Sequence, residues 1–341
     1  MNTHCSKYLI IDTDAGVDDA QALISALRLQ HSYTILGITT VEGNCPRHHV
    51  DTNVRRVVKA CNSTVPVYPG CSSHVVELRK PHQASYVHGV DGLGDVDWST
   101  ELEGTLESVF PLQTKKAAVF LSESVAKYKD QLDIVALGPL TNIHVALKLD
   151  DSIISNIGKV FIMSGSLSGT GNVTKNSEFN CFTDPEAAHE CFRLLPKIEL
   201  ITWDLTLSST VNWDFYNILC KQDSISSRFF KLISAKTAQF VSTELNCGWT
   251  LPDPLCMLVC LFPEVVKKSS STRVKVLLHG VNRGRTIPFH QWEEFNDNEL
   301  DLMWEGEGER EGEREGVEMN VNNVEEVDMI LIEKLLADSL I

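Results

Sequence analysis

Four aspartates lie within eight residues near the start of the chain, namely Asp12, Asp14, Asp18 and Asp19. They follow the apolar run 8–11 and lead into a helical pattern. Four like charges in one corner are costly unless a cation or protons compensate them. Ligands that are all oxygen favour a hard ion, Ca²⁺ or Mg²⁺, over zinc. The spacing therefore predicts a site for a metal or a polar substrate.

Helix capping is the alternative explanation for these carboxylates, because aspartate is common before a helix and in its first turn. Capping accounts for one or two of the four residues. It does not account for Asp12 and Asp14, which share one side of a strand end. We expect Gly16 to allow the tight turn that brings Asp18 and Asp19 back toward them, and we favour cation binding.

The elements that must position these residues alternate between strands and helices, the signature of βαβ units and a parallel sheet. The predicted strands are 7–11, 34–41, 65–68, 132–137, 159–163, 198–202 and 273–278. The predicted helices are 18–30, 47–61, 115–129, 140–149, 185–194 and a last one near 324–340, with 212–262 mainly helical. We predict an α/β fold with a single open, mostly parallel sheet flanked by helices, in one domain spanning 1–341. In such sheets, ligands bind at the carboxyl ends of the strands.

Further polar residues gather where the predicted strands end. Asn44 follows the second strand, and Leu137 leads into a Gly-Pro-Leu-Thr-Asn exit from the fourth. A polar loop after the fifth strand contains Glu178 and Asn180, which offer hydrogen-bond partners for hydroxyl groups. Asp184 before Pro185 is explained as a helix start. The strand ends therefore predict one shared crevice.

Composition excludes several classes of function. A formal charge of −16 argues against a nucleic-acid partner, which would need a basic face. Residues 305–318 hold seven Glu against two Arg, a net of −5, and we interpret this run as a disordered acidic insertion. Ten cysteines without a CxxC pair read as free thiols of a cytosolic protein rather than a disulfide framework. No stretch is long and apolar enough for a membrane anchor or signal peptide, so we expect a cytoplasmic protein without a membrane partner.

Together the motifs resemble the nucleoside hydrolases, the inosine-uridine preferring family that cleaves the N-glycosidic bond of ribonucleosides. The resemblance covers about residues 7–300 and rests on segments in order: DTDAGVDD, TTVEGN, YPGC, HGVDGLGD, ALGPLTN, EFN followed by DPEAA, and the late PDP. It implies the Rossmann-like fold of that family, a ribonucleoside substrate and assembly as a homodimer or homotetramer. Base preference is left open.

The resemblance also implies roles for individual residues. A Ca²⁺ ion would be held by Asp14, Asp19, the carbonyl of Leu137 and Asp253. Asp14 would also be the general base, with Asp12 in support. The residues that match positions contacting or flanking the ribose are Asp18, Asn44, Met163, Asn172, Glu178, Phe179 and Asn180.

The chain departs from the family at the group that protonates the leaving base. Pro252 stands before Asp253 where familiar members have a histidine, and proline cannot donate a proton. His88, in the segment that resembles the mobile family loop, is the replacement we favour as catalytic proton donor, with plain solvent exposure as the alternative. Trp249 could stack on the base or belong to the core.

Three readings of function follow. The first is a Ca²⁺-dependent ribonucleoside hydrolase that gives ribose and a free base, which we favour. The second is a low-activity or inactive ribose-binding relative, motivated by Pro252. The third is a phosphotransferase of the DxD type, which does not predict the EFN segment or Asp253.

Overall fold

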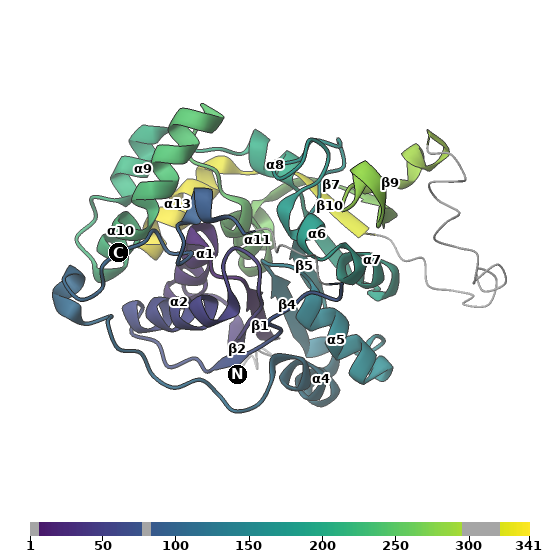
Figure 1. Cartoon of the computed structure of the whole chain (residues 1–341), viewed down its shortest axis with the longest axis horizontal. Coiled ribbons are helices and arrows are strands. Elements are labelled where there is room, and N and C mark those ends of the chain that lie inside the picture. The colour runs from purple at the N-terminus through teal and green to yellow at the C-terminus, as the bar shows by residue number, and fades with distance from the viewer. Residues whose placement is uncertain (1–6, 77–82, 295–320) are drawn as a thin grey trace, which may run out of the picture.

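The fold is built on one central sheet, shown by a computed structural model that describes residues 7–76, 83–294 and 321–341 (Figure 1). Among the described residues this sheet has eight strands in the order β3-β2-β1-β4-β5-β6-β10-β7. All neighbours pair in parallel except β10 and β7. The strands are β1 (Lys7–Thr13), β2 (Tyr33–Thr40), β3 (Val67–Pro69), β4 (Leu132–Ala136), β5 (Val160–Met163), β6 (Ile198–Ile201), β7 (Val266–Thr272) and β10 (Val321–Val327), and β8 (Val274–Val276) with β9 (Thr286–Pro288) makes a separate hairpin. The predicted mostly parallel sheet is confirmed.

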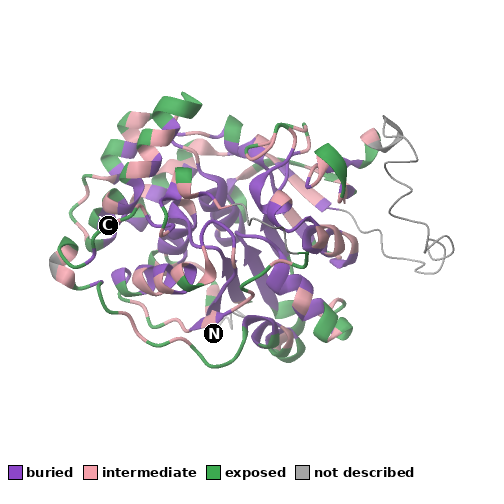
Figure 2. Cartoon of the chain, in the orientation of Figure 1, coloured by how far each residue is buried: buried purple, intermediate pink, exposed green. Residues whose placement is uncertain are grey.

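Helices cover both faces of the sheet, as Figure 1 shows. They are α1 (Val17–Arg28), α2 (Arg47–Ala60), α3 (Ser85–His88), α4 (Ala117–Tyr128), α5 (Thr141–Leu149), α6 (Phe179–Thr183), α7 (Pro185–Leu194), α8 (Trp203–Ser208), α9 (Trp213–Leu219), α10 (Ile225–Phe240), α11 (Pro252–Leu261) and α13 (Met329–Ser339). Strand alternation explains the two layers of core. Leu9 and Ile11 of β1 join one apolar cluster with α1, α2 and α11, whereas Ile10 joins a second cluster with α4, α5 and α7. Figure 2 shows the sheet buried between them.

The turn after β1 differs from the prediction in where its unusual backbone falls. Ala15, not Gly16, adopts a left-handed conformation, with φ of 41°, whereas Gly16 has φ of −74°. Gly16 is instead suited to close packing, because a Cβ there would lie 2.7 Å from Asn44 Nδ2 and 3.1 Å from His88 Cε1. The expected role of Gly16 as the turn residue was therefore wrong. Its small size lets α1 begin directly beside the loop after β2.

The last part of the chain corrects two predicted elements. The segment 321–327 is strand β10 rather than the start of the last helix, which begins at Met329. The buried positions of β10 are Val321, Val324 and Val327, a spacing of three that imitates a helix. Val321 packs in the core on one face of the sheet and Val324 in the core on the other, and register shifts after Val324 bring Val327 to the same side as Val324. The strand predicted at 273–278 shrinks to β8, which belongs to the hairpin, while the polar edge strand β7 was not predicted.

Other predicted elements agree with the structure to within a few residues at each end. Helix α7 begins at Pro185 as expected, with Asp184 Oδ1 accepting a hydrogen bond from the backbone of Ala187 at 3.2 Å. The acidic run 305–318 lies outside the described residues. Within the described parts of the chain, no helix combines the length and the apolar character needed to cross a membrane.

Candidate active site

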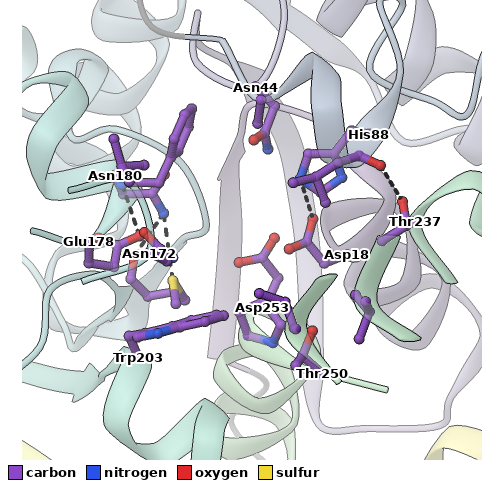
Figure 3. Close-up of a pocket in the computed structure, with 18 of the residues that line it drawn as sticks. Asp18, Asn44, His88, Asn172, Glu178, Asn180, Trp203, Thr237, Thr250 and Asp253 are labelled. Carbon is purple, nitrogen blue, oxygen red and sulfur yellow. Dashed lines mark hydrogen bonds and ion pairs between the residues drawn. The ribbon is translucent and has the colours of Figure 1, made fainter. Parts of the chain in front are cut away.

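A cavity of about 380 Å³ opens where the carboxyl ends of the central strands meet α10 and α11 (Figure 3). Its size suits a small organic ligand. The predicted site residues that line it are Asp18, Asn44, His88, Leu137, Met163, Asn172, Glu178, Phe179, Asn180, Trp249 and Asp253. The other three, Asp12, Asp14 and Asp19, are fully buried and are not among the described residues that line it. Tertiary structure thus brings eleven of the fourteen to one cavity.

Three carboxylates form the compact acidic cluster of the site. Asp18, Asp19 and Asp253 each place an oxygen within 4.8 Å of the others. Asp253 lies in the first turn of α11, and Asp18 and Asp19 lie in the first turn of α1. Burial and then the charge of Asp19 raise the pKa of Asp253 well above its usual value. The helix starts therefore carry more negative charge than capping requires, and a cation would relieve it.

Asp14 is held at one oxygen and free at the other. Its Oδ2 accepts a hydrogen bond from the backbone N–H of Asn44 at 2.8 Å. Its Oδ1 is buried and has no hydrogen-bond partner among the described residues. Glycines make room for this carboxylate, because a Cβ on Gly43 would lie 2.1 Å from Oδ2 and one on Gly138 would lie 2.8 Å from Oδ1. Burial, followed by the charge of Asp19, raises the pKa of Asp14 well above its usual value.

Asp19 is oriented by neighbours on both sides of the turn. Its Oδ1 accepts from the hydroxyl of Thr13 at 2.5 Å, and its Oδ2 accepts from the backbone of Gly16 at 2.8 Å. The side-chain amide of Asn44 also donates to Oδ2, at 3.2 Å. Burial is the main reason that the pKa of Asp19 rises to about 6. Asn44 thus contacts both Asp14 and Asp19, through its backbone and its side chain respectively.

Asp12 lies deeper, at the end of β1. Its Oδ1 accepts from Thr39 at 2.5 Å and from Asn142 at 2.7 Å, while its Oδ2 has no partner among the described residues. Burial raises the pKa of Asp12 to about 7. Asn142 also donates to the Thr40 carbonyl at 2.9 Å. Asp12 therefore ties β1, β2 and the start of α5 together.

The wall opposite this cluster is built by the end of β5 and by α6, and Figure 3 shows Asn172, Glu178 and Asn180 on that side. Asn180 donates its side-chain amide to the carbonyls of Leu137 at 2.7 Å and Met163 at 3.0 Å. Glu178 caps α6, with Oε1 accepting from the backbone of Asn180 at 2.9 Å. These bonds fix the orientation of the Leu137 carbonyl, which has a second lone pair available.

His88 is buried rather than exposed, with 6% of its surface accessible. Its Nδ1 accepts a hydrogen bond from the backbone of Val17 at 3.2 Å, and its Nε2 lies 3.8 Å from Asp18 Oδ1. Burial lowers the pKa of His88 to about 4, against the opposing effect of the Asp19 charge. The ring is therefore neutral at pH 7, with its proton on the Nε2 that faces Asp18.

Trp249 lines the cavity but is packed as a core residue, with 1% of its surface accessible. Its ring lies 5.0 Å from that of Tyr216, and its Nε1 donates to Gln21 Oε1 at 3.0 Å. Among the other lining residues, the sequence prediction missed Tyr86, Trp203, Thr237, Phe240, Val241, Leu245 and Thr250. Trp203 lies two residues after the end of β6, so the strand-end signal could have found it. The lining residues from α10 follow only the apolar spacing of a helix, so no motif marks them as part of a site.

Two observations on the described residues fit a bound cation. A trio of carboxylates converges, and two buried carboxylate oxygens, on Asp12 and Asp14, have no hydrogen-bond partner in the described parts of the chain. The trio contains Asp19 and Asp253, two of the predicted carboxylate ligands, and it contains Asp18 in place of Asp14.

Comparison with known proteins now identifies the family. The family model described as inosine-uridine preferring nucleoside hydrolase matches residues 9–331. The chain belongs to that family. It is therefore a nucleoside hydrolase, an enzyme that hydrolyses the N-glycosyl bond of ribonucleosides.

Relatives of this nucleoside hydrolase include plant and bacterial enzymes. It is 32% identical over 286 residues to uridine nucleosidase 1 of Arabidopsis thaliana, covering 82% of this chain and 81% of the relative. It is 33% identical over 261 residues to the non-specific ribonucleoside hydrolase RihC of Salmonella paratyphi A, covering 76% and 81%. Among solved structures, a plant nucleoside hydrolase has a TM-score of 0.83 at 26% identity, covering 98% of this chain and 99% of that one. An inosine-guanosine nucleoside hydrolase has a TM-score of 0.81 at 27% identity, covering 98% of both chains.

Proposed function

We propose that the chain is a Ca²⁺-dependent hydrolase of ribonucleosides whose reaction takes place in the cavity beside the aspartate cluster. The observation that carries the proposal is the unpartnered Oδ1 of buried Asp14, next to a trio of carboxylates and to the Leu137–Gly138 turn. We assign the ion to Asp14, Asp19, Asp253 and the Leu137 carbonyl. When bound, Ca²⁺ would lower the pKa of a water and orient it with the ribose hydroxyls.

Asp14 is the group that we assign to accept the proton from the attacking water. Its Oδ2 is fixed by the backbone of Asn44, and its Oδ1 has no hydrogen-bond partner among the described residues, so Oδ1 is the atom that we assign to this role. The water oxygen forms a bond to C1′ of ribose while the bond from C1′ to the base nitrogen breaks, and the base leaves with that electron pair. Asp12 supports the same corner through Thr39 and Asn142.

Ribose is assigned to the polar side chains on the two walls of the cavity. Asp18 and Asn44 lie on one wall, and Asn172, Glu178 and Asn180 lie on the other. Met163 and Phe179 complete the sugar subsite. The buried carboxylates favour the positive charge that develops on the sugar as the base departs, because charge is stabilised strongly where water is excluded.

His88 is assigned as the donor toward the leaving base. Its Nδ1 is occupied by Val17, so its Nε2–H is the hydrogen that can reach a ligand in the cavity. Pro252 lines the same cavity without a proton to give. We propose that Trp249 supports the wall rather than stacking on the base, since its ring is enclosed by other aromatic side chains.

The proposal is tested by measuring ribose release from a panel of nucleosides that includes uridine and inosine, with and without a calcium chelator. We expect turnover that chelation abolishes and added Ca²⁺ restores. Pro252 favours one second candidate, a ribose-binding relative with little turnover. Tight binding of a ribose analogue without detectable ribose release would support that candidate and contradict the enzyme.

A further inference from the structure

The loop between β5 and α6, residues 164–178, forms part of the wall opposite His88 (Figure 3). Its members Thr170, Gly171, Asn172 and Val173 line the cavity. No strand or helix lies between β5 and α6, so sheet pairing does not hold this segment. Its position depends on contacts that come from elsewhere in the chain.

Thr286, at the start of β9, makes two of these contacts through one hydroxyl. The Oγ1 of Thr286 accepts a hydrogen bond from the backbone N–H of Ser166 at 2.8 Å and donates one to the Ser166 carbonyl at 2.7 Å. The side chain thus satisfies both backbone groups of Ser166, as a paired strand would. Thr286 has 1% of its surface accessible, so water does not replace these bonds.

Ser166 extends this set of hydrogen bonds along the loop. Its hydroxyl donates to Asp204 Oδ1 at 2.9 Å and accepts from the backbone of Thr170 at 3.0 Å. Asp204, in the first turn of α8, also accepts from the backbone of Leu167 at 2.7 Å. Thr170 precedes Asn172 by two residues and lines the cavity. The first half of the loop is therefore held between Thr286 and α8.

The second half of the loop is held by the same hairpin. The hydroxyl of Ser177 donates to the Arg283 carbonyl at 2.8 Å, and Ser177 accepts from the backbone of Asn172 at 3.2 Å. Asn176 donates to the Asn282 side chain at 2.9 Å. The Arg283 guanidinium contacts Glu186 of α7 at 2.6 and 2.7 Å. The segment 282–286 is thus anchored to α7 and holds both ends of the loop.

We propose that Thr286 is a positioning residue for the hydrolase reaction: through Ser166 it fixes the loop that presents Asn172 to the substrate. This inference rests on the proposed function, because Asn172 is assigned there to ribose. Thr286 does not line the cavity and touches no reacting atom. Its effect must therefore pass through the loop, in which Thr170 and Asn172 are the polar side chains that line the cavity between 170 and 173, and Asn172 is the one assigned to ribose.

Steady-state hydrolysis of uridine or inosine by Thr286→Val tests the proposal, because valine keeps the shape and removes the hydroxyl. We expect KM to rise about tenfold with kcat changed by less than about threefold, since a lost ground-state contact raises KM. Thr286→Ser restores the hydroxyl and keeps KM near wild type. In an Asn172→Ala background, Thr286→Val lowers kcat/KM by less than about twofold further, because the two substitutions act through one contact.

Ser339→Ala is the matched control, since Ser339 is equally buried at 1% and donates to the Leu336 carbonyl at 2.7 Å far from the loop. It should lower thermal stability without changing KM. If Thr286→Val does not fold, Ser177→Ala, which frees the other end of the loop, should raise KM in the same way. An unchanged KM in these loop variants, equal losses for serine and valine, or full additivity with Asn172→Ala would overturn the proposal. Absence of hydrolysis by the wild-type chain would instead refute the proposed function.

Discussion

The Nδ1 atom of His88 accepts a hydrogen bond from the backbone N–H of Val17, at 3.2 Å. The bond joins the segment around α3 to the first turn of α1, next to Asp18 and Asp19. Because Nδ1 is the acceptor, the neutral ring carries its proton on Nε2. The backbone of α1 therefore determines which nitrogen of His88 can donate into the cavity.

Substitutions of His88 distinguish the role of Nδ1, which accepts a hydrogen bond from Val17, from the role of Nε2, which we assign to donate toward the base. Asparagine can place an oxygen near the Nδ1 position and keep the Val17 contact, but it has no donor at the Nε2 position. We expect His88→Asn to fold and to lose about 10²- to 10⁴-fold in kcat, the scale of a missing acid. His88→Gln, whose amide can reach the Nε2 position, should retain more activity. Equal kcat values for wild type and His88→Asn would exclude His88 as the donor.

Asp14 should be indispensable for turnover. Asp14→Ala removes the oxygen assigned to accept the water proton, and we expect hydrolysis to become undetectable. Asp14→Asn is the matched variant, because its side-chain oxygen can still accept from the Asn44 backbone and preserve the local structure. It should fold and yet lose at least about 10²-fold in kcat/KM, since an amide cannot serve as the base. Near-normal hydrolysis by either variant would overturn the assignment.

Gly43 should be required for its small size. A Cβ at this position would lie 2.1 Å from Asp14 Oδ2, so Gly43→Ala must displace the carboxylate or the loop. A shift of about 1 Å at a reacting group costs roughly 10²-fold in rate, and we expect kcat/KM to fall by that factor. Gly280→Ala is the control: no atom lies within 4 Å of its Cβ position, and its φ of 65° makes alanine strained there, so it should lower stability without changing kcat/KM. Gly43→Ala with wild-type kinetics would show that the packing around Asp14 is not needed.

Calcium should stabilise the protein more at pH 8 than at pH 5. Without a cation, burial raises the pKa of Asp19 to about 6 and the pKa values of Asp14 and Asp253 well above their usual range, so the folded chain binds their protons more tightly than the unfolded chain. Metal-free stability therefore falls as pH rises from the unfolded pKa near 4 through this window. Ca²⁺ binds the deprotonated carboxylates and offsets that loss.

The measurement is the thermal unfolding midpoint in excess Ca²⁺ and in chelator at both pH values. Saturating ion should raise the midpoint by roughly 5 °C or more at pH 8, and by less at pH 5. Mg²⁺ at the same concentration serves as the comparison for a smaller ion that demands stricter geometry. A calcium effect that is equal at both pH values, or larger at pH 5, would contradict a site built on these carboxylates.

The sequence by itself determined the parallel α/β arrangement, because apolar runs and helical patterns alternate and each polar motif follows a strand end. In a parallel sheet those ends meet at one edge, so residues as distant as Asp12 and Asn142 could be expected to converge, whereas the approach of Asp253 to Asp19 was implied by the family resemblance. Capping signals were also local: Asp184 before Pro185 fixed the start of α7.

Only the tertiary structure decided the features that depend on packing between distant segments. Strand β10 has buried residues at helical spacing, and its pairing with β6 and β7 overrides that pattern. The burial of His88, the enclosure of Trp249 and the place of Thr237 and Phe240 of α10 in the cavity wall depend on neighbours far along the chain. Thr286 carries no motif, and its hydroxyl reaches Ser166 only because the fold brings residues 120 positions apart into contact. Preferences for helix, strand and cap depend on short stretches of sequence, whereas these contacts arise from the packing of the whole chain.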